Sequence, residues 1–203
     1  MSMSSFHLRL LVIIVIALVV FALIASAVVN RAHRSRSIVL DLGEVPDFEF
    51  TRSNGQPYGL NDMKGKLNVV DFIFTNCKGA CPIMSANMLD LYHLFQDSEE
   101  VRFVSISVDP ERDTLETLKR YADSLGVADD RWVFLSAPVD SVIDLCENGF
   151  MMAAENLPMG HPTKFVLVDA NGVIRSYHDG LNEQAMNRLV ENIVVLARET
   201  DAN

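Results

Sequence analysis

The sequence predicts an α/β domain in which helices cover both faces of a mostly parallel central sheet that ends in a C-terminal hairpin. Apolar runs rich in β-branched and aromatic residues alternate with stretches of helical character, an alternation typical of α/β proteins. Asn171-Gly172 separates two such runs near the end of the chain and predicts the hairpin. Residues 10–29 carry no charged side chain. Because twenty apolar residues in a helix span a bilayer, one transmembrane helix is predicted before the domain.

The N-terminal apolar segment has two interpretations. A retained anchor is favoured because the run is long for a signal peptide and a cluster of arginines follows it. Ala25-Ser26-Ala27 has the form of a cleavage site, which leaves a cleaved signal as the alternative. We therefore expect an anchor at residues 1–29, a polar tether at residues 30–44 and the folded domain at residues 45–203.

The charges that flank the predicted span favour a cytoplasmic domain. Arg31, Arg34 and Arg36 follow the span, whereas Arg9 and the amino terminus precede it. The positive-inside rule would keep the domain on the cytoplasmic side, but large domains translocate largely regardless of flanking charge. The flanking charges therefore do not decide the orientation.

The strands of the domain follow from local sequence. A short edge strand is expected at Phe48 and Phe50, which alternate with acidic residues, and turns are expected at residues 54–55 and 58–59. Continuous apolar runs predict buried strands at about residues 68–75, 101–108 and 132–135. The hairpin strands are expected at residues 165–168 and 173–177.

Helices are expected between these strands. Pro82 begins the first helix, which extends to about Phe95, because proline fits the first helical turn. A capping box at residues 113–116 begins the second, which ends near Leu125. A short helix at residues 140–148 closes at Gly149, and the last helix covers about residues 182–198. The order β-α-β-α-β-α-β-β-α is the thioredoxin-like pattern.

The predicted domain is strongly acidic. The chain has a formal net charge of −10, and residues 45–203 contain 25 acidic and 13 basic side chains, a charge of −12. Such a domain would repel nucleic acid and anionic lipid headgroups. It is compatible with metal cations or a basic protein partner, although acidic surfaces also serve solubility alone.

Cys77 and Cys81 are the residues best suited to chemistry. They lie between a core strand and a helix, where backbone N–H groups and the helix dipole lower thiol pKa values. Three residues separate them, whereas dithiol oxidoreductases of the thioredoxin type have two. Two thiols on one helix face can bind Cu(I) or Zn(II), or close a disulfide. The pair alone does not choose between these outcomes.

A third ligand would favour a metal, and His161 is the expected source. It leads into the strand at residues 165–168, and the loop before this strand faces the cysteine loop in a thioredoxin-like fold. Imidazole is the commonest metal-ligating side chain. The other histidines have no comparable position: His7, His33, His93 and His178.

The remaining sulfur-containing side chains are expected to be structural. Cys146 lies in an apolar helical stretch, where a lone cysteine is usually a small buried hydrophobe. Thioethers are soft ligands, but Met151, Met152 and Met159 are expected to fill gaps in the core.

Three blocks of the chain together resemble one family. The run from Asp71 to Pro82 resembles the signature of the Sco/SenC family of copper-binding assembly proteins, and residues 107–114 are similar to a second block of that family. His161 matches the family histidine by its spacing from Gly172. The resemblance covers roughly Val45 to Ala197.

The resemblance implies one copper ion, as Cu(I) or Cu(II), bound by Cys77, Cys81 and His161. It implies a role in maturing the binuclear copper site of cytochrome c oxidase, with that oxidase subunit and other copper carriers as partners. The implied location is the bacterial cytoplasmic membrane, with the domain on its extracytoplasmic side. Asp109 resembles a family acidic residue near the site, although Asp-Pro pairs also simply form turns.

One departure from the family supports a different function. Pro162 stands where family members commonly have Ser or Thr, and it resembles the cis-proline of thioredoxin-type reductases. A thiol–disulfide oxidoreductase acting on partner cysteines is therefore the alternative, with Cys77 as the expected attacking thiol. A redox or copper sensor is a third interpretation. A peroxiredoxin is disfavoured because Thr75 lies two residues, not three, before Cys77.

Overall fold

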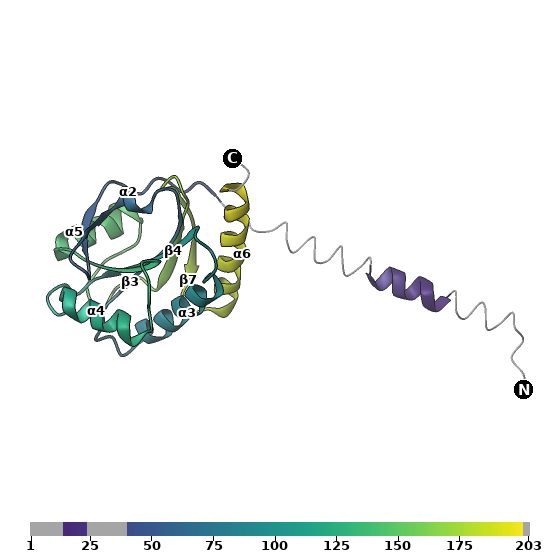
Figure 1. Cartoon of the computed structure of the whole chain (residues 1–203), viewed down its shortest axis with the longest axis horizontal. Helices are drawn as coiled ribbons and strands as arrows, with labels where there is room; N and C mark the ends of the chain where they lie inside the picture. Colours follow the sequence, from purple (N-terminus) through teal and green to yellow (C-terminus); the bar gives the residue numbers. More distant parts are fainter. Residues whose placement is uncertain (1–13, 24–39, 201–203) are drawn as a thin grey trace, which may run out of the picture. The chain divides into compact units, whose positions relative to one another are not determined.

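The computed structural model describes residues 14–23 and 40–200. The chain divides into two compact units, Met1–Ile38 and Val39–Asn203, and the second holds the α/β fold (Figure 1). Residues 14–23 form a helix with exposed apolar side chains. No helix among the described residues is both long enough and apolar enough to cross a membrane. The predicted span at residues 10–29 extends at both ends into residues outside the described part.

Seven strands form one sheet in the order β2-β1-β5-β4-β3-β6-β7. The strands are β1 Glu49–Arg52, β2 Pro57–Gly59, β3 Leu67–Ile73, β4 Val101–Ser107, β5 Trp132–Ser136, β6 Lys164–Val168 and β7 Ile174–Asp179. The central strands β3, β4 and β5 are parallel, whereas the pairs β1/β2, β1/β5, β3/β6 and β6/β7 are antiparallel. The expectation of a mostly parallel sheet is therefore wrong, and the sheet is mixed. Apolar runs predict where strands lie but do not fix their direction.

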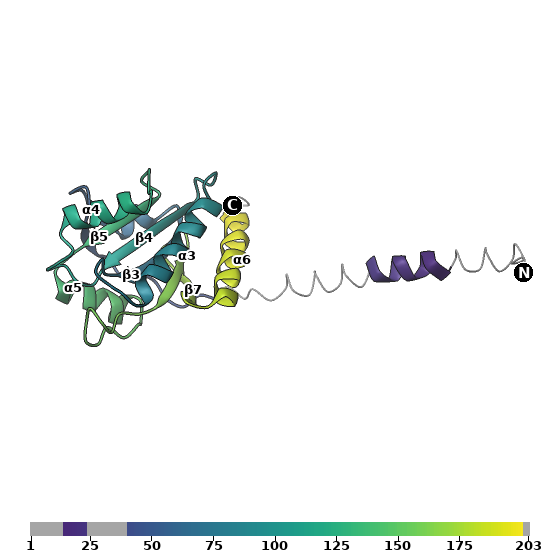
Figure 2. The same ribbon diagram turned by 90° about the horizontal axis from the view of Figure 1, so that it is seen from below.

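Helices cover both faces of the sheet, as expected. They are α2 Leu60–Met63, α3 Ala80–Leu94, α4 Leu115–Ser124, α5 Val139–Asp144, which continues as the π-helical turn η1 Leu145–Gly149, and α6 Glu183–Thr200. In Figure 1, α3 and α4 lie on one side of the sheet, and α2 and α5 on the other. A hydrogen bond of 2.8 Å between Ser85 Oγ and Tyr121 Oη ties α3 to α4. Figure 2 shows α6 next to α3, on the side of α3 away from α4.

One predicted turn is instead a strand. Residues 58–59 belong to β2, which pairs with β1. β2 is therefore the edge strand of the sheet, and β1, the strand expected at the edge, lies inside it. A Cβ atom at Gly59 would collide with the carbonyl oxygen of Phe48. Gly59 is therefore required for the close approach of two chain segments rather than for a turn.

Every residue of β3 is buried, including the polar residues Asn68 and Asp71. Asn68 Nδ2 donates to the carbonyl oxygens of Met63 and Lys66. Asp71 Oδ1 accepts a hydrogen bond of 2.6 Å from Ser105 Oγ, but Asp71 Oδ2 has no protein partner. Burial raises the pKa of Asp71 to about 7, and the Ser105 hydrogen bond offsets only part of this effect. The centre of the sheet thus contains a carboxyl group that ionises near neutral pH.

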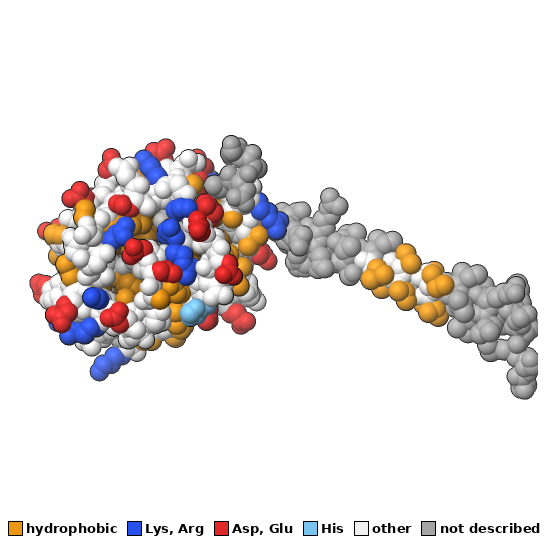
Figure 3. All heavy atoms as spheres, viewed as in Figure 1, with side chains coloured by type: hydrophobic (Ala, Val, Ile, Leu, Met, Phe, Trp, Pro, Cys, Tyr) orange, Lys and Arg blue, Asp and Glu red, His pale blue; other side chains and the backbone are white. Residues whose placement is uncertain are grey.

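The surface of the domain carries many acidic side chains, as its composition requires. Figure 3 shows acidic side chains spread over the visible face, with Lys and Arg side chains interspersed among them. Mixed charge of this kind favours solubility. Because the basic side chains on the visible face are scattered among acidic ones, they form no continuous patch that could bind nucleic acid.

Candidate metal centre

The two cysteines lie on either side of a helix start. Cys77 belongs to the loop that follows β3, and Cys81 is the second residue of α3, which begins after the N-cap residue Gly79. Only Cys81 therefore lies within the helix. The sequence also allowed an arrangement with both cysteines in the first helical turn, which the structure does not show. The Cys81 side chain is buried and Cys77 is half-buried, and both are free thiols.

The structure brings Cys77, Cys81 and His161 together. One ligand atom from each residue lies within 4.8 Å of the others, and no other such group of three is present in the described residues. His161 Nε2 is 3.2 Å from Cys81 Sγ. Metal–sulfur bonds of about 2.3 Å and metal–nitrogen bonds of about 2.0 Å place ligand atoms on one ion roughly 3.6–4.0 Å apart. To hold one ion, the Nε2–Sγ pair would lengthen by about 0.5 Å, and any separation near the 4.8 Å limit would shorten by about 1 Å.

The hydrogen bonds of His161 leave its Nε2 lone pair facing the thiols. Nδ1 lies 3.1 Å from the carbonyl oxygen of Pro162, which can only accept, so Nδ1 carries the proton and Nε2 accepts from the Cys81 thiol. The edge of the Phe74 ring packs against the imidazole with centroids 5.5 Å apart. Burial lowers the pKa of His161, which keeps the ring neutral at neutral pH. A neutral imidazole with a free Nε2 is the form that binds a metal.

The two thiols have opposite electrostatic environments. Burial raises the pKa of Cys81 to about 12, which favours its protonated form. Burial also acts to raise the pKa of Cys77, but hydrogen bonds from the N–H groups of Cys81 and Gly79 outweigh it, and the net shift is downward. The Gly79 N–H lies 3.4 Å from Cys77 Sγ. Cys77 is therefore the better nucleophile of the pair.

A buried carboxylate holds the cysteine loop in place. Asp113 Oδ1 accepts a hydrogen bond of 2.6 Å from Thr75 Oγ1, and its Oδ2 accepts from the Thr75 N–H at 3.1 Å and from Ser107 Oγ at 2.7 Å. The sequence placed Asp113 at a helix cap, but the N-cap of α4 is Thr114, which accepts from the Thr117 N–H. Asp113 was thus missed as a positioning residue. Its place in the family-like block at residues 107–114 was the available signal.

Asp109 is not part of the cluster. It is buried and pairs with Arg112 at 2.9 Å, so its main contact is an ion pair within its own turn. The peptide bond before Pro162 is trans, since the cis proline bond among the described residues precedes Pro158. The likeness of Pro162 to the cis-proline of reductases therefore does not extend to its geometry.

The other sulfur-containing residues divide between core and surface. Cys146 is buried, with Sγ 3.4 Å from the carbonyl oxygen of Met152, and Met152 is itself buried. Met151 and Met159 are 57% and 79% exposed, so the expectation that they fill the core is wrong. Both lie in the irregular loop before β6, where no sheet or helix covers them.

The other described histidines lie outside the cluster. His93 is exposed on α3. His178 is buried and lies 3.0 Å from the carbonyl oxygen of Ala185. The remaining two, His7 and His33, are outside the described residues.

Comparison with known proteins identifies the family. A model of the SCO1/SenC family matches residues 41–195, which is most of the chain. The chain belongs to the SCO1/SenC family. The resemblance inferred from residues 71–82 and 107–114 is confirmed. A SCO1 protein homolog of Bacillus subtilis is 32% identical over 156 residues, which cover 74% of this chain and 81% of the relative.

Solved structures of SCO1/SenC proteins share the fold. A SCO1/SenC family lipoprotein of Bacillus anthracis has a TM-score of 0.70 at 31% identity, covering 76% of this chain and 95% of that one. BsSco, described as having a disulfide switch and as a member of the Sco family of cytochrome c oxidase assembly proteins, gives 0.71 at 29% identity, covering 80% and 99%. ScoI of Bradyrhizobium japonicum with copper bound gives 0.59 at 25% identity, covering 77% and 99%. The predicted thioredoxin-like α/β fold is confirmed, with the mixed sheet described above.

Proposed function

We propose that this SCO1/SenC protein binds one copper ion through Cys77, Cys81 and His161 and delivers it to the binuclear copper site of a cytochrome c oxidase subunit. The observation that carries the proposal is the convergence of two sulfur atoms and one imidazole nitrogen within 4.8 Å. The copper-bound structure of the B. japonicum relative supports the choice of metal. The description of BsSco as an oxidase assembly protein supports the choice of recipient.

The donor set suits a transferable copper ion. Thiolates are soft ligands that select Cu(I), and imidazole accepts both Cu(I) and Cu(II). Because metals bind the thiolate, copper binding releases the Cys81 proton, which otherwise forms the hydrogen bond to His161 Nε2. Cys77 is half-buried, so one ligand remains accessible to the cysteines of a recipient.

A copper titration tests this proposal. The full chain in detergent, reduced and anaerobic, would be titrated against a competing Cu(I) chelator, with absorption and EPR spectra recorded for Cu(II). We expect one copper per chain, and at least a tenfold weaker affinity in His161→Ala. His93→Ala is the matched control because His93 is exposed on α3 and outside the cluster. Unchanged copper affinity in a folded His161→Ala variant would contradict the three-ligand proposal.

Thiol–disulfide exchange is a second candidate, favoured by the unequal thiols. The Cys77 thiolate would attack a partner disulfide, forming a Cys77–partner bond and releasing the other partner sulfur as a thiolate. Cys81 would then lose its proton and attack Cys77 Sγ, forming the Cys77–Cys81 disulfide and releasing the second partner thiolate. Two electrons pass from the protein to the partner. The disulfide switch described for BsSco supports this chemistry.

The location is also a proposal. We infer that residues 1–29 anchor the chain in the cytoplasmic membrane, that the residues between this anchor and the folded domain form a tether, and that the domain lies on the extracytoplasmic side. The description of the B. anthracis relative as a lipoprotein supports membrane association. A membrane-impermeant maleimide should label Cys77 in intact spheroplasts. Labelling only after lysis would contradict this orientation.

A further inference from the structure

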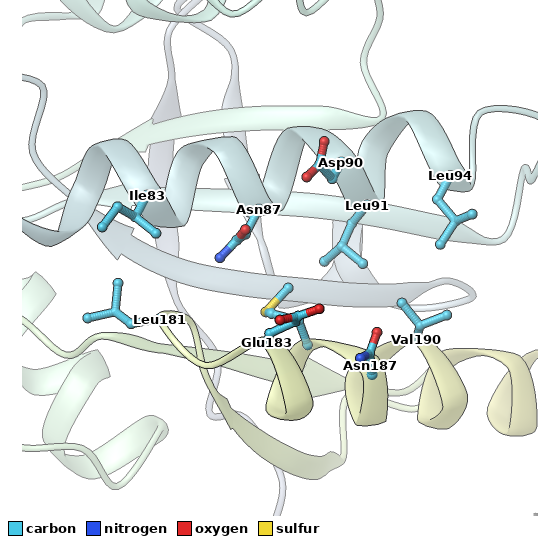
Figure 4. A pocket seen from close by; sticks show the side chains of 10 residues that line it. Ile83, Asn87, Asp90, Leu91, Leu94, Leu181, Glu183, Asn187 and Val190 are labelled. Carbon is cyan, nitrogen blue, oxygen red and sulfur yellow. The ribbon is translucent and has the colours of Figure 1, made fainter.

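A groove of about 380 Å³ runs between α3 and α6, with exposed apolar side chains along it (Figure 4). Ile83 and Leu94 of α3 are 53% and 61% exposed, and Leu181, just before α6, is 45% exposed. Leu91 and Val190 also line the groove. An apolar strip of this kind, bordered by polar side chains, is typical of interaction sites.

One end of the groove is formed by residues that lie close in the chain to those of the metal centre, although Cys77, Cys81 and His161 do not line it. On one wall, Ile83 follows Cys81 by two residues. On the other, the Gly180 N–H donates to the carbonyl oxygen of Thr163 at 2.8 Å, and Thr163 follows His161 by two residues. Asn87 Nδ2 donates to the Gly180 carbonyl oxygen at 2.7 Å and joins the two walls. These hydrogen bonds connect the two walls of the groove to each other and to the loop that carries His161.

The charge of the groove is entirely negative. Asp90 and Glu183 are the ionisable residues that line it, and both are exposed. None of its ten lining residues is basic. Complementary charge guides partner choice and raises association rates, so the groove favours a ligand that combines an apolar strip with basic flanks.

We propose that this groove is the docking site for a basic amphipathic helix of a partner protein. Its walls are two helices lying side by side, from Ile83 to Leu94 and from Glu183 to Val190 (Figure 4). At a rise of about 1.5 Å per residue, the α3 wall is about 16 Å long, which matches three turns of a bound helix. Amphipathic helices bind such grooves through apolar residues spaced at i, i+3, i+4 and i+7. The proposal does not depend on copper binding.

The same charges disfavour other occupants. A second copy of this chain docking through the same groove would bring two Asp90 and two Glu183 side chains into one interface without any basic lining residue. Like charges across an interface oppose association. An anionic lipid surface would meet the same repulsion. A basic partner helix satisfies both the apolar strip and the charge.

Peptide binding to the full chain in zwitterionic lipid nanodiscs tests the proposal. The probe is a fluorescein-labelled 14-residue helix with Leu at positions i, i+4, i+7 and i+11 and Lys elsewhere. Controls are a peptide of the same composition with scrambled Leu positions, a peptide with Glu in place of Lys, and empty nanodiscs. We expect the Lys peptide to bind at least tenfold more tightly than either control peptide.

Groove variants localise the binding. Leu94→Asn combined with Leu181→Ser should weaken Lys-peptide binding at least tenfold, whereas Val139→Asn, which alters an exposed apolar residue outside the groove, should leave it unchanged. Asp90→Lys combined with Glu183→Lys should reverse the preference towards the Glu peptide. Copper affinity should be the same in all these variants, which separates this test from that of the proposed function.

Three outcomes would overturn the proposal. The first is the absence of Lys-peptide binding at millimolar concentration, and the second is equal binding of the scrambled peptide. The third is sedimentation showing self-association that Leu94→Asn abolishes, which would make a second copy the occupant.

Discussion

Replacing Asp71 by asparagine should change how the stability of the protein depends on pH. Asp71 is fully buried at the centre of the sheet, and one of its oxygens has no protein partner. Burial raises its pKa from 3.8 to about 7, so the folded state favours the neutral acid. The stabilisation from this preference is complete below pH 3.8 and is lost as the pH rises towards 7. The amide introduced by Asp71→Asn does not ionise, so the variant lacks this dependence.

The size of the effect follows from the shift. One pKa unit corresponds to about 1.36 kcal/mol, so a shift of about 3 units is worth about 4 kcal/mol. Relative to Asp71→Asn, the wild type should lose about 1.4 kcal/mol of unfolding free energy per pH unit between about pH 4 and pH 7, and no more above that. The introduced amide keeps an oxygen that can accept from Ser105 Oγ. Any cost of its unpaired NH₂ group is independent of pH and does not alter the slope.

Urea unfolding at about pH 4.5, 6 and 8 measures the difference directly across this range. Other titrating groups are common to both proteins and cancel in the comparison. Asp90→Asn, which neutralises an exposed carboxylate on α3, is the control: it keeps Asp71 and should therefore keep the wild-type loss of stability between about pH 4.5 and pH 8. A constant difference between wild type and Asp71→Asn across this range would refute the argument that Asp71 is protonated in the folded protein.

Three further predictions concern other buried or reactive groups. Asp113→Ala removes the acceptor of three hydrogen bonds and should cost about 3 kcal/mol or more in urea unfolding, with equal stability ruling out its positioning role. Burial lowers the pKa of His178 from 6.5 to about 4, so stability should fall by up to about 3 kcal/mol as the pH drops through this range. In His178→Gln that contribution should vanish, and an unchanged acid slope in urea unfolding would contradict it. Iodoacetamide at neutral pH should alkylate Cys77 faster than Cys81, as peptide mass spectrometry would show, and the reverse order would contradict the assigned pKa directions.

The core strands could be predicted because burial on both faces leaves a clear trace in the sequence. The runs that became β3, β4 and β5 are continuous, as strands covered on two sides must be. Gly172 has a φ of 85° in the hairpin turn, a left-handed conformation that glycine adopts without steric cost. Strand β2 was missed because Pro57 and Gly59 are uncommon in strands. They are accepted here because β2 is an edge strand with a close backbone contact.

The candidate metal centre was predictable in outline because its three residues flank regular elements. Cys77 and Cys81 border the end of β3 and the start of α3, and His161 precedes β6, so the fold class alone placed them near one another. The supporting contacts were not predictable from the local sequence pattern. Asp113 reaches Thr75 across 38 residues, and no local pattern distinguishes a carboxylate that turns inward from one that caps a helix.

The contact between His161 and Cys81 makes the two proposed functions separable. His161 Nε2, at 3.2 Å from Cys81 Sγ, has one lone pair, which accepts either the thiol proton or a copper ion but not both. Removing the imidazole therefore takes away the proposed copper ligand while leaving both sulfur atoms able to exchange disulfides. If His161→Ala loses copper but reduces a partner disulfide at the wild-type rate, the histidine serves copper and the cysteines serve both reactions. If exchange slows in parallel with copper loss, His161 also accepts the Cys81 proton during the second sulfur attack. Both activities would then depend on the same histidine nitrogen.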